Sequence, residues 1–201
     1  MAKTNGSSNN NNRSYKMRLI FKSTIFLMAI YTTSCNTSEV GLENANDRFS
    51  SEEIVELNKI VSSFDSILVK KYGCTSLAPA YLVFSDSTFS SLDHSLLLEF
   101  DLIYSIYDEI YEYQVAEKIW WKDPHDKDRI NYSSNKPYMD YLFEQGLKNS
   151  FIHEYWENVN SVSDIGPSMV LFFSKNANKL NFNNRNHRLI FAIHYFTIYN
   201  R

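Results

Sequence analysis

Residues 50–73 carry the clearest pattern of hydrophobic and polar positions in the chain. Their apolar side chains recur at steps of three and four residues, which places them on one face of a helix. Ser50 and Glu53 have the spacing of a capping box at the start of this segment, and Gly73 suits the left-handed position that ends many helices. The pattern therefore predicts a capped helix with one buried face. The residues of that face are Ile54, Leu57, Val61, Phe64 and Leu68.

A longer regular segment covers residues 90–121. Apolar side chains follow helical steps on its predicted inner face, and polar side chains follow the same steps on the opposite face. At about 1.5 Å per residue, a helix of this length spans roughly 45 Å and would form the backbone of the domain. The inner face consists of Leu96, Phe100, Ile103, Tyr107 and Ile110, and the opposite face of Asp101, Ser105, Asp108 and Glu112.

Two short apolar runs break the helical pattern. Pro79 is incompatible with the interior of a helix, so residues 80–84 (AYLVF) are predicted to form a short strand or an extended link. A strand needs a partner, and the candidate is residues 169–174 (MVLFFS). These two runs leave a small α+β fold open as an alternative.

The C-terminal part of the chain returns to helical signals. Residues 122–136 are typical of a polar loop, and Pro137 suits the first position of a further helix, which Gly146 divides. The last helix, residues 187–200, is apolar on nearly every side and is therefore predicted to be buried.

The fold class predicted from these segments is all-α, a single helical domain of about five helices. The composition agrees with this prediction, because only 5 glycines and 4 prolines occur in 201 residues. A many-stranded sandwich or barrel needs a turn every 8 to 12 residues. A hydrophobic content of 44% is also too high for an intrinsically disordered chain.

Charge is distributed unevenly along the chain. The net charge is −3, and residues 1–34 contain five basic and no acidic side chains, which leaves −8 for residues 35–201. An acidic body argues against binding to a nucleic acid backbone, which requires clustered lysine and arginine. We therefore expect no nucleic acid partner.

The basic start of the chain has the three parts of a secretory signal peptide. Arg18 and Lys22 supply the positive region, residues 25–31 (IFLMAIY) the apolar core, and residues 32–34 the small residues before Cys35. The apolar run is far shorter than the roughly 20 residues of a membrane-spanning helix.

The residues TTSC, ending at Cys35, resemble the lipobox of bacterial lipoproteins. Ser34 and Cys35 match its pattern, and Thr32 stands where the family usually has an aliphatic residue. The resemblance implies that the thiol of Cys35 and the new amino terminus are acylated after cleavage, which anchors the protein to a membrane. Asn36, where enteric lipoproteins retained in the inner membrane have aspartate, favours the outer membrane of the cell envelope. The alternative is a secreted protein with a disulfide between Cys35 and Cys74.

These signals divide the chain into three predicted parts. Residues 1–34 are a leader and lipoprotein signal peptide, residues 35–49 are the lipidated cysteine and a polar, flexible tether, and residues 50–201 are the helical domain. Met1 to Lys16 is polar and rich in asparagine, so we expect translation to start at Met17.

Histidines are the main candidates for metal chemistry. His153 and Glu157 lie four residues apart, and His187 and His194 lie one heptad apart, so each pair shares a helical face. Together they would suit a metal-dependent hydrolase if the pairs met. The alternative is that His187 and His194 are core residues bonded to the backbone or to tyrosine.

Aromatic and acidic residues offer further candidates. Trp120, Trp121 and Tyr113 are of the types that contact a carbohydrate or a protein partner. The carboxylates of Asp101, Asp108 and Glu112 invite an acid–base interpretation, but their spacing is more simply that of a solvated helix face.

No catalytic residue and no cofactor is predicted from motifs in this sequence. It contains no Gly-rich phosphate loop, no nucleophile elbow and no Cys-Xaa-Xaa-Cys motif. The expected function is that of a lipid-anchored envelope lipoprotein whose domain binds another protein without catalysis, attached to the membrane through Cys35. A metal-dependent hydrolase and a carbohydrate-binding module are the alternatives.

Overall fold

A computed structural model provides the fold, and its described residues all belong to the unit Val40–Arg201. The described residues are 41–42, 45, 47–73, 76–90, 106, 108–122, 130–133, 136–162 and 165–199. Cys35, Cys74, His94 and His125 lie outside them, as does the predicted signal peptide. The lipidation of Cys35 and its alternative disulfide therefore stay predictions.

The described part of the chain is mainly helical, as the sequence predicted. It contains eight helices, including one 3-10 helix, and one two-stranded sheet. The helices are α2 (Ser51–Tyr72), α3 (Leu77–Ser90), α6 (Ala116–Ile119), α7 (Pro137–Gly146), α8 (Ser150–Val162), α9 (Pro167–Asn176), the 3-10 helix η1 (Ala177–Lys179) and α10 (Arg185–Tyr199). The antiparallel strands are β1 (Trp120–Lys122) and β2 (Ile130–Tyr132).

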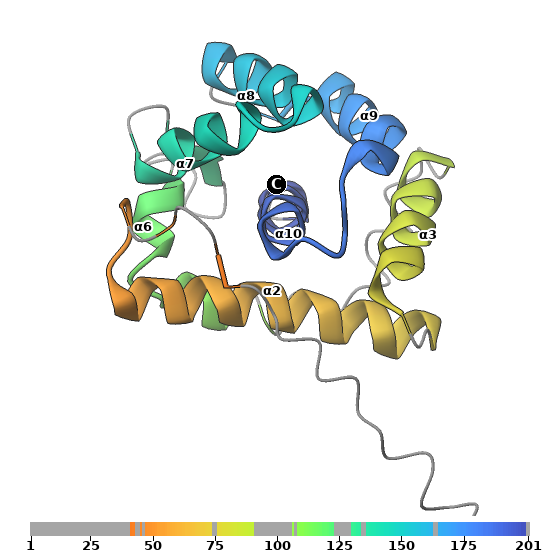
Figure 1. The fold of residues 1–201 in the computed structure, drawn as a ribbon, viewed down its shortest axis with the longest axis horizontal. Coiled ribbons are helices and arrows are strands. Elements are labelled where there is room, and N and C mark those ends of the chain that lie inside the picture. Colours follow the sequence, from red (N-terminus) through yellow and green to blue (C-terminus); the bar gives the residue numbers. More distant parts are fainter. Residues whose placement is uncertain are drawn as a thin grey trace, which may run out of the picture. The chain divides into compact units, whose positions relative to one another are not determined.

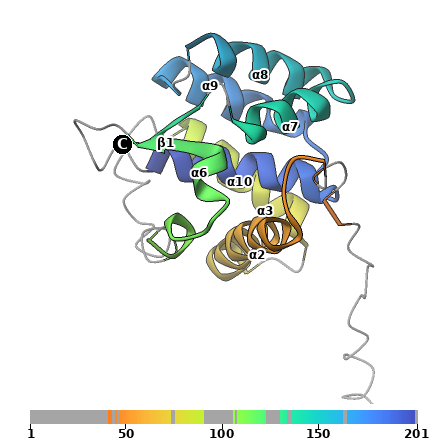
Figure 2. The ribbon, with the colours of Figure 1, turned by 90° about the vertical axis from the view of Figure 1, so that its left-hand side faces the viewer.

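The helix α10 runs through the middle of this unit, and the other helices surround it. Figure 1 looks along α10, with α2 below it, α3 at one side, α8 and α9 above, and α6 and α7 at the other side. Figure 2, turned by 90°, shows α10 along its length between α2 and the α7–α8 pair. This arrangement explains why a helix near the end of the sequence is apolar on nearly every side.

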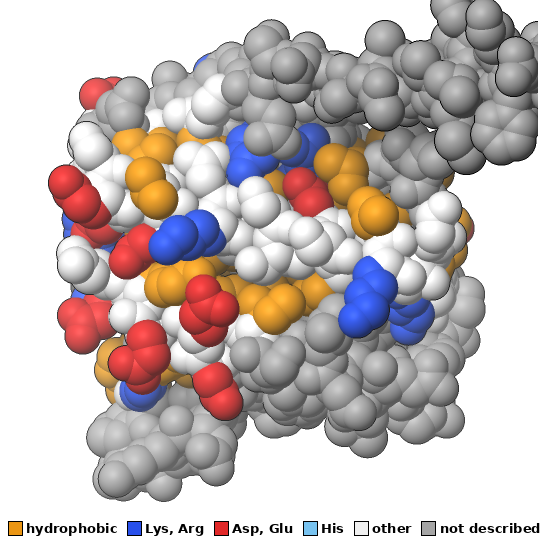
Figure 3. Space-filling view, turned by 90° about the horizontal axis from the view of Figure 1, so that it is seen from below, with side chains coloured by type: hydrophobic (Ala, Val, Ile, Leu, Met, Phe, Trp, Pro, Cys, Tyr) orange, Lys and Arg blue, Asp and Glu red, His pale blue; other side chains and the backbone are white. Residues whose placement is uncertain are grey.

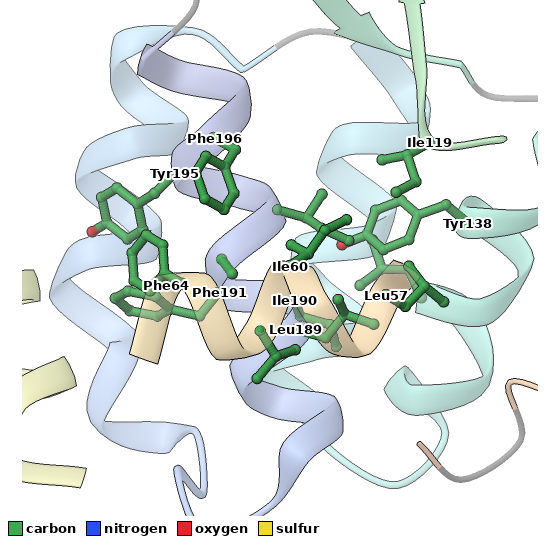
Figure 4. Close-up of a cluster of buried hydrophobic side chains, with 14 of the residues drawn as sticks. Leu57, Ile60, Phe64, Ile119, Tyr138, Leu189, Ile190, Phe191, Tyr195 and Phe196 are labelled. Atoms are coloured by element: carbon green, nitrogen blue, oxygen red, sulfur yellow. The ribbon is translucent and has the colours of Figure 1, made fainter. Parts of the chain in front are cut away.

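Burial confirms that α10 is the central helix. Every residue from Arg185 to Thr197 is buried, and Leu189 to Phe191 are fully buried. Figure 4 shows α10 side chains, among them Phe191 and Tyr195, meeting Phe64 of α2. The two helices thus form the centre of the hydrophobic core.

The helix α2 has the caps that its sequence predicted. The Ser50 hydroxyl accepts a hydrogen bond from the Glu53 N–H at 3.3 Å, and the Glu53 carboxylate accepts one from the Ser50 N–H at 2.7 Å. Gly73 ends the helix with a φ of 59°. This left-handed conformation is unfavourable for residues that carry a side chain, so glycine is preferred here.

Charges on α2 follow the helix dipole. Glu52 and Glu53 lie in its first turn, and Lys70 and Lys71 in its last. In Figure 3, which views the face of α2 opposite to α10, acidic side chains gather on the left, toward its first turn, and basic side chains stand at the right as well as nearer the middle. The outer face of α2 is therefore polar at both ends.

The prediction of a strand or extended link at residues 80–84 is wrong, because these residues belong to α3. The helix begins at Leu77, so Pro79 lies in its first turn. At that position the N–H that proline lacks would have had no partner inside the helix. Tyr81 and Phe84 are fully buried, and α3 packs against α2 and α9. The proposed partner, residues 169–174, is also helical, in α9.

The predicted long helix over residues 90–121 is interrupted. Residues 91–105 lie outside the described part, and residues 112–115 form a turn before α6. Trp120 then has an extended backbone and opens β1, which pairs with Ile130–Tyr132 of the predicted polar loop. This sheet was not foreseen, since three-residue strands leave no readable alternation.

Gly146 separates α7 from α8, as predicted, and also permits their close packing. A Cβ atom at this position would lie 2.9 Å from Cα of His153 on α8. Because α7 and α8 pack against each other, a larger residue here would push them apart. Pro137 occupies the first turn of α7, where the sequence placed it.

The packed unit begins earlier in the chain than residue 50, where the sequence placed its start. Leu42, Ala45 and Phe49 are buried in the hydrophobic core, within the segment expected to be a tether. Phe49 packs edge-on against Tyr141 at 6.2 Å between ring centroids. Polar residues separate these three apolar ones, so the composition of the segment is typical of a linker.

Candidate functional site

The four candidate metal ligands do not come together. Among the described residues, no group of three His, Cys, Asp or Glu side chains lies close enough to hold a metal ion. His153 and Glu157 do meet on α8, at 3.6 Å between Nε2 and Oε1, where Glu157 is exposed and His153 partly exposed. His187 and His194 lie on α10, where each is buried.

Both α10 histidines have hydrogen-bond partners of the kind foreseen for core residues. Nδ1 of His187 accepts a hydrogen bond of 2.8 Å from the backbone N–H of Asn181. Nδ1 of His194 shares one of 2.8 Å with the hydroxyl of Tyr155, which lies 3.3 Å from the hydroxyl of Tyr132. A chain of buried hydroxyl groups thus ends on the His194 ring.

The pKa of His194 lies well below its ordinary value of 6.5, because complete burial penalises the charged ring. The ring stacks on Phe173 at 3.8 Å between centroids, and within the described part of the chain Nε2 has no hydrogen-bond partner. The neutral histidine is therefore the form that the fold accommodates.

We expect the free energy of unfolding to fall as the pH drops below 6.5. The unfolded chain then takes up a proton at His194 that the folded chain does not, so acid favours unfolding. His194→Phe keeps a ring against Phe173 and should make the free energy of unfolding less dependent on pH. Burial also lowers the pKa of His187, which accounts for the pH dependence that remains. The measurement is urea unfolding at pH values on both sides of 6.5, and parallel profiles for the two proteins would contradict the assignment.

The three aromatic candidates occupy different environments. Trp120 is buried, and its Nε1–H donates a 2.7 Å hydrogen bond to Thr197 on α10. Trp121 is 47% exposed. Tyr113 donates to Glu109 at 2.8 Å and borders a separate cavity of about 300 Å³ beside Lys59. The structure therefore joins the two tryptophans at one site and places Tyr113 at another.

A cavity of about 350 Å³ lies beside the two tryptophans. Tyr111, rather than Tyr113, supplies its third aromatic side chain, because the turn at residues 112–115 directs the two tyrosines to different places. The other polar lining residues are Glu117, Lys122 and Lys136. Sequence reasoning missed the lysines, since Lys136 is separated from Lys122 by the segment that follows β1.

An exposed aromatic patch on the α7–α8 pair was also missed. It consists of Phe143, Leu147, His153 and Trp156, and we call it the α7–α8 patch. The Phe143 and Trp156 rings lie 4.7 Å apart, and the His153 ring stacks on Trp156 at 5.6 Å. Phe143 and Leu147 are four residues apart, a helical spacing that could have indicated a shared face.

The acidic candidates lie in solvent where the structure describes them. Asp108 and Glu112 are both exposed, and Asp101 is outside the described residues. This agrees with the simpler interpretation of the spacing, a solvated helix face.

Comparisons with known proteins assign no family, since no family model, no curated protein and no solved structure matches the chain. Among the described helices, none has the length and apolar character needed to cross a membrane.

Proposed function

We propose that this chain is a bacterial lipoprotein of the cell envelope, anchored to the outer membrane through Cys35, and that its helical domain binds another protein. The signal-peptide pattern and the lipobox-like residues before Cys35 support the anchor. One acyl chain binds a membrane only marginally, so the stable anchor would rest on multiple acylation at Cys35.

The observation that carries protein binding is the α7–α8 patch. Phe143 is 36% exposed and packs against the partly exposed Trp156, and Leu147, one helical turn after Phe143, is 68% exposed. Large apolar side chains gathered at a surface favour contact with another protein, and Trp and Phe are enriched in the cores of protein interfaces. Gly146 brings α7 and α8 together at this point, so the patch rests on rigid elements.

Charge around the patch indicates the chemistry of the partner. Glu154 and Glu157 are exposed beside His153 and Trp156, while Glu144, on the α7 side, is paired with Arg48 at 2.8 Å. On the α8 side of the patch, the partner would therefore present basic side chains beside its apolar ones. Complementary charges of this kind steer association and fix its orientation.

A photo-crosslinking amino acid at Leu147, in living cells, should capture one envelope protein. The same amino acid at Val55, an apolar position on α2 that is 55% exposed, serves as the control and should not capture it. Glu157→Lys should weaken the crosslink by reversing a charge without removing buried surface. In the same cells, Cys35→Ser should move the protein from the membrane to the soluble fraction.

The crosslinking experiment and the fractionation experiment can each contradict one part of the proposal. Identical crosslinks at positions 147 and 55, or a crosslink that Glu157→Lys leaves unchanged, would refute protein binding by the patch. Membrane fractionation that survives Cys35→Ser would refute the lipid anchor and leave the patch to be judged separately.

A further inference from the structure

The cavity beside Trp120 has the features of a small-molecule site, independent of the α7–α8 patch. Its volume of about 350 Å³ lies at the lower end of the 300–1,000 Å³ typical of ligand pockets. Its lining combines aromatic side chains with a few charged groups, which is the usual division between contact area and orientation in such sites.

One wall of the cavity is held rigidly. Trp120 is buried and donates its Nε1–H to Thr197, whose hydroxyl donates in turn to the Ile193 carbonyl at 2.7 Å. The Tyr111 ring stacks on Trp120 with 6.4 Å between centroids and 18° between planes. The wall is therefore fixed to the central helix α10, and little ordering would be lost on binding.

Positive charge is concentrated at the same wall. Nζ of Lys122 lies 3.8 Å from the centroid of the Tyr111 ring, a cation–π contact that holds the ammonium group at the cavity. Lys122 shares a face of β1 with Trp120, since alternate residues of a strand point the same way. Lys136, just before α7, is a second lysine of the lining.

In the ranges that the structure describes, neither Lys122 nor Lys136 forms an ion pair with a carboxylate, and Glu117 is the one acid among the described residues of the lining. The described lining residues thus carry a net positive charge, with two lysines and one glutamate, on a part of the chain, residues 35–201, that is net −8. A local excess of positive charge favours an anionic ligand.

The Tyr111 hydroxyl also suits a ligand with oxygen atoms. Burial and the nearby Glu117 raise the pKa of Tyr111 to about 12, so the hydroxyl keeps its proton at neutral pH. It is a neutral group that neither repels an anion nor competes with it for the lysines.

We propose that this cavity binds a small carboxylate that carries one ring, with the carboxylate at Lys122 and Lys136 and the ring along the wall formed by Tyr111 and Trp120. An acidic monosaccharide and an aromatic acid share this chemistry. A neutral sugar lacks the group that the lysines select, and inorganic phosphate lacks the ring.

The full chain, purified in detergent, should bind galacturonate or benzoate in calorimetric titration and should not bind galactose or inorganic phosphate. Binding should weaken as ionic strength rises, because salt screens the lysines. Saturation by galacturonate alone identifies the ligand as an acidic sugar, and saturation by benzoate alone as an aromatic acid.

Lys122→Gln and Lys136→Gln should each weaken binding at least tenfold, since each removes one ammonium group from the cavity. Lys175→Gln, at an exposed position on α9, is the matched control and should leave binding unchanged. Thermal unfolding of each variant verifies that it is folded. The proposal is overturned if neither carboxylate binds, if galactose or phosphate binds equally well, or if both cavity lysine variants bind like the control.

Discussion

A chain that ends at Asn184 should not fold, although it lacks only 17 of 201 residues. The deletion removes α10, in which every residue from Arg185 to Thr197 is buried. The surrounding helices would lose the surface against which they pack, and hydrophobic burial is the main favourable term in folding. The deletion therefore removes the centre of the core rather than a terminal extension.

Polar contacts made by α10 would be lost as well. Arg185 donates to the side chain of Asn58 and, at 3.0 Å, to its carbonyl, and Arg188 lies 3.4 Å from the carboxylate of Asp65. Without α10, Asp65 would stay near the core with its cation removed, which is strongly unfavourable.

Circular dichroism and urea titration measure this outcome. The truncated chain should show no cooperative unfolding transition, whereas a chain that ends at Tyr199 keeps α10 and should unfold like the full protein. A cooperative transition in the chain that ends at Asn184 would show that α10 is dispensable and that the core is centred elsewhere.

Phe191→Ala should destabilise the domain by about 3–5 kcal/mol, the usual cost of truncating a fully buried phenylalanine. The Phe191 ring is at the meeting point of several elements. Its centroid lies 5.8 Å from that of Phe64 on α2, 4.9 Å from that of Tyr81 on α3 and 5.7 Å from that of Phe173 on α9. Because these rings belong to different helices, the cavity left by alanine cannot close by a small local shift.

The loss is large relative to the 5–15 kcal/mol that stabilises a typical domain. Asp108→Ala, at an exposed position, is the control and should change the free energy of unfolding by less than about 0.5 kcal/mol. Both values come from urea unfolding. A loss below about 1 kcal/mol for Phe191→Ala would contradict its central place in the core, and a large loss for Asp108→Ala would return attention to the acidic face as a buried or functional feature.

Local patterns in the sequence were sufficient for several elements. The capping box of Ser50 and Glu53, the stop at Gly73 and the break at Gly146 all appear in the structure as predicted. So does the burial of α10. Each of these features depends on residues within a few positions of one another, where backbone geometry and hydrophobic period determine the outcome.

Elements whose conformation depends on distant partners were predicted poorly. Residues 80–84 are helical because Tyr81 and Phe84 find aromatic neighbours on α10, and this packing overrides a short apolar run that could equally have been a strand. Trp120 leaves the helical path because its strand pairs with Tyr132 and its indole reaches Thr197, 77 residues further along the chain.

The sequence by itself determined the helical class of this protein, the caps of α2 and the identity of its most buried helix. Only the tertiary structure decided which side chains meet. It joined Tyr111, instead of Tyr113, to Trp120 and Lys122, and it assembled Phe143 and Trp156 from two helices into one patch. The reason is that helical period fixes the direction of a side chain about its own axis, whereas its neighbours depend on how helices distant in sequence pack against α10.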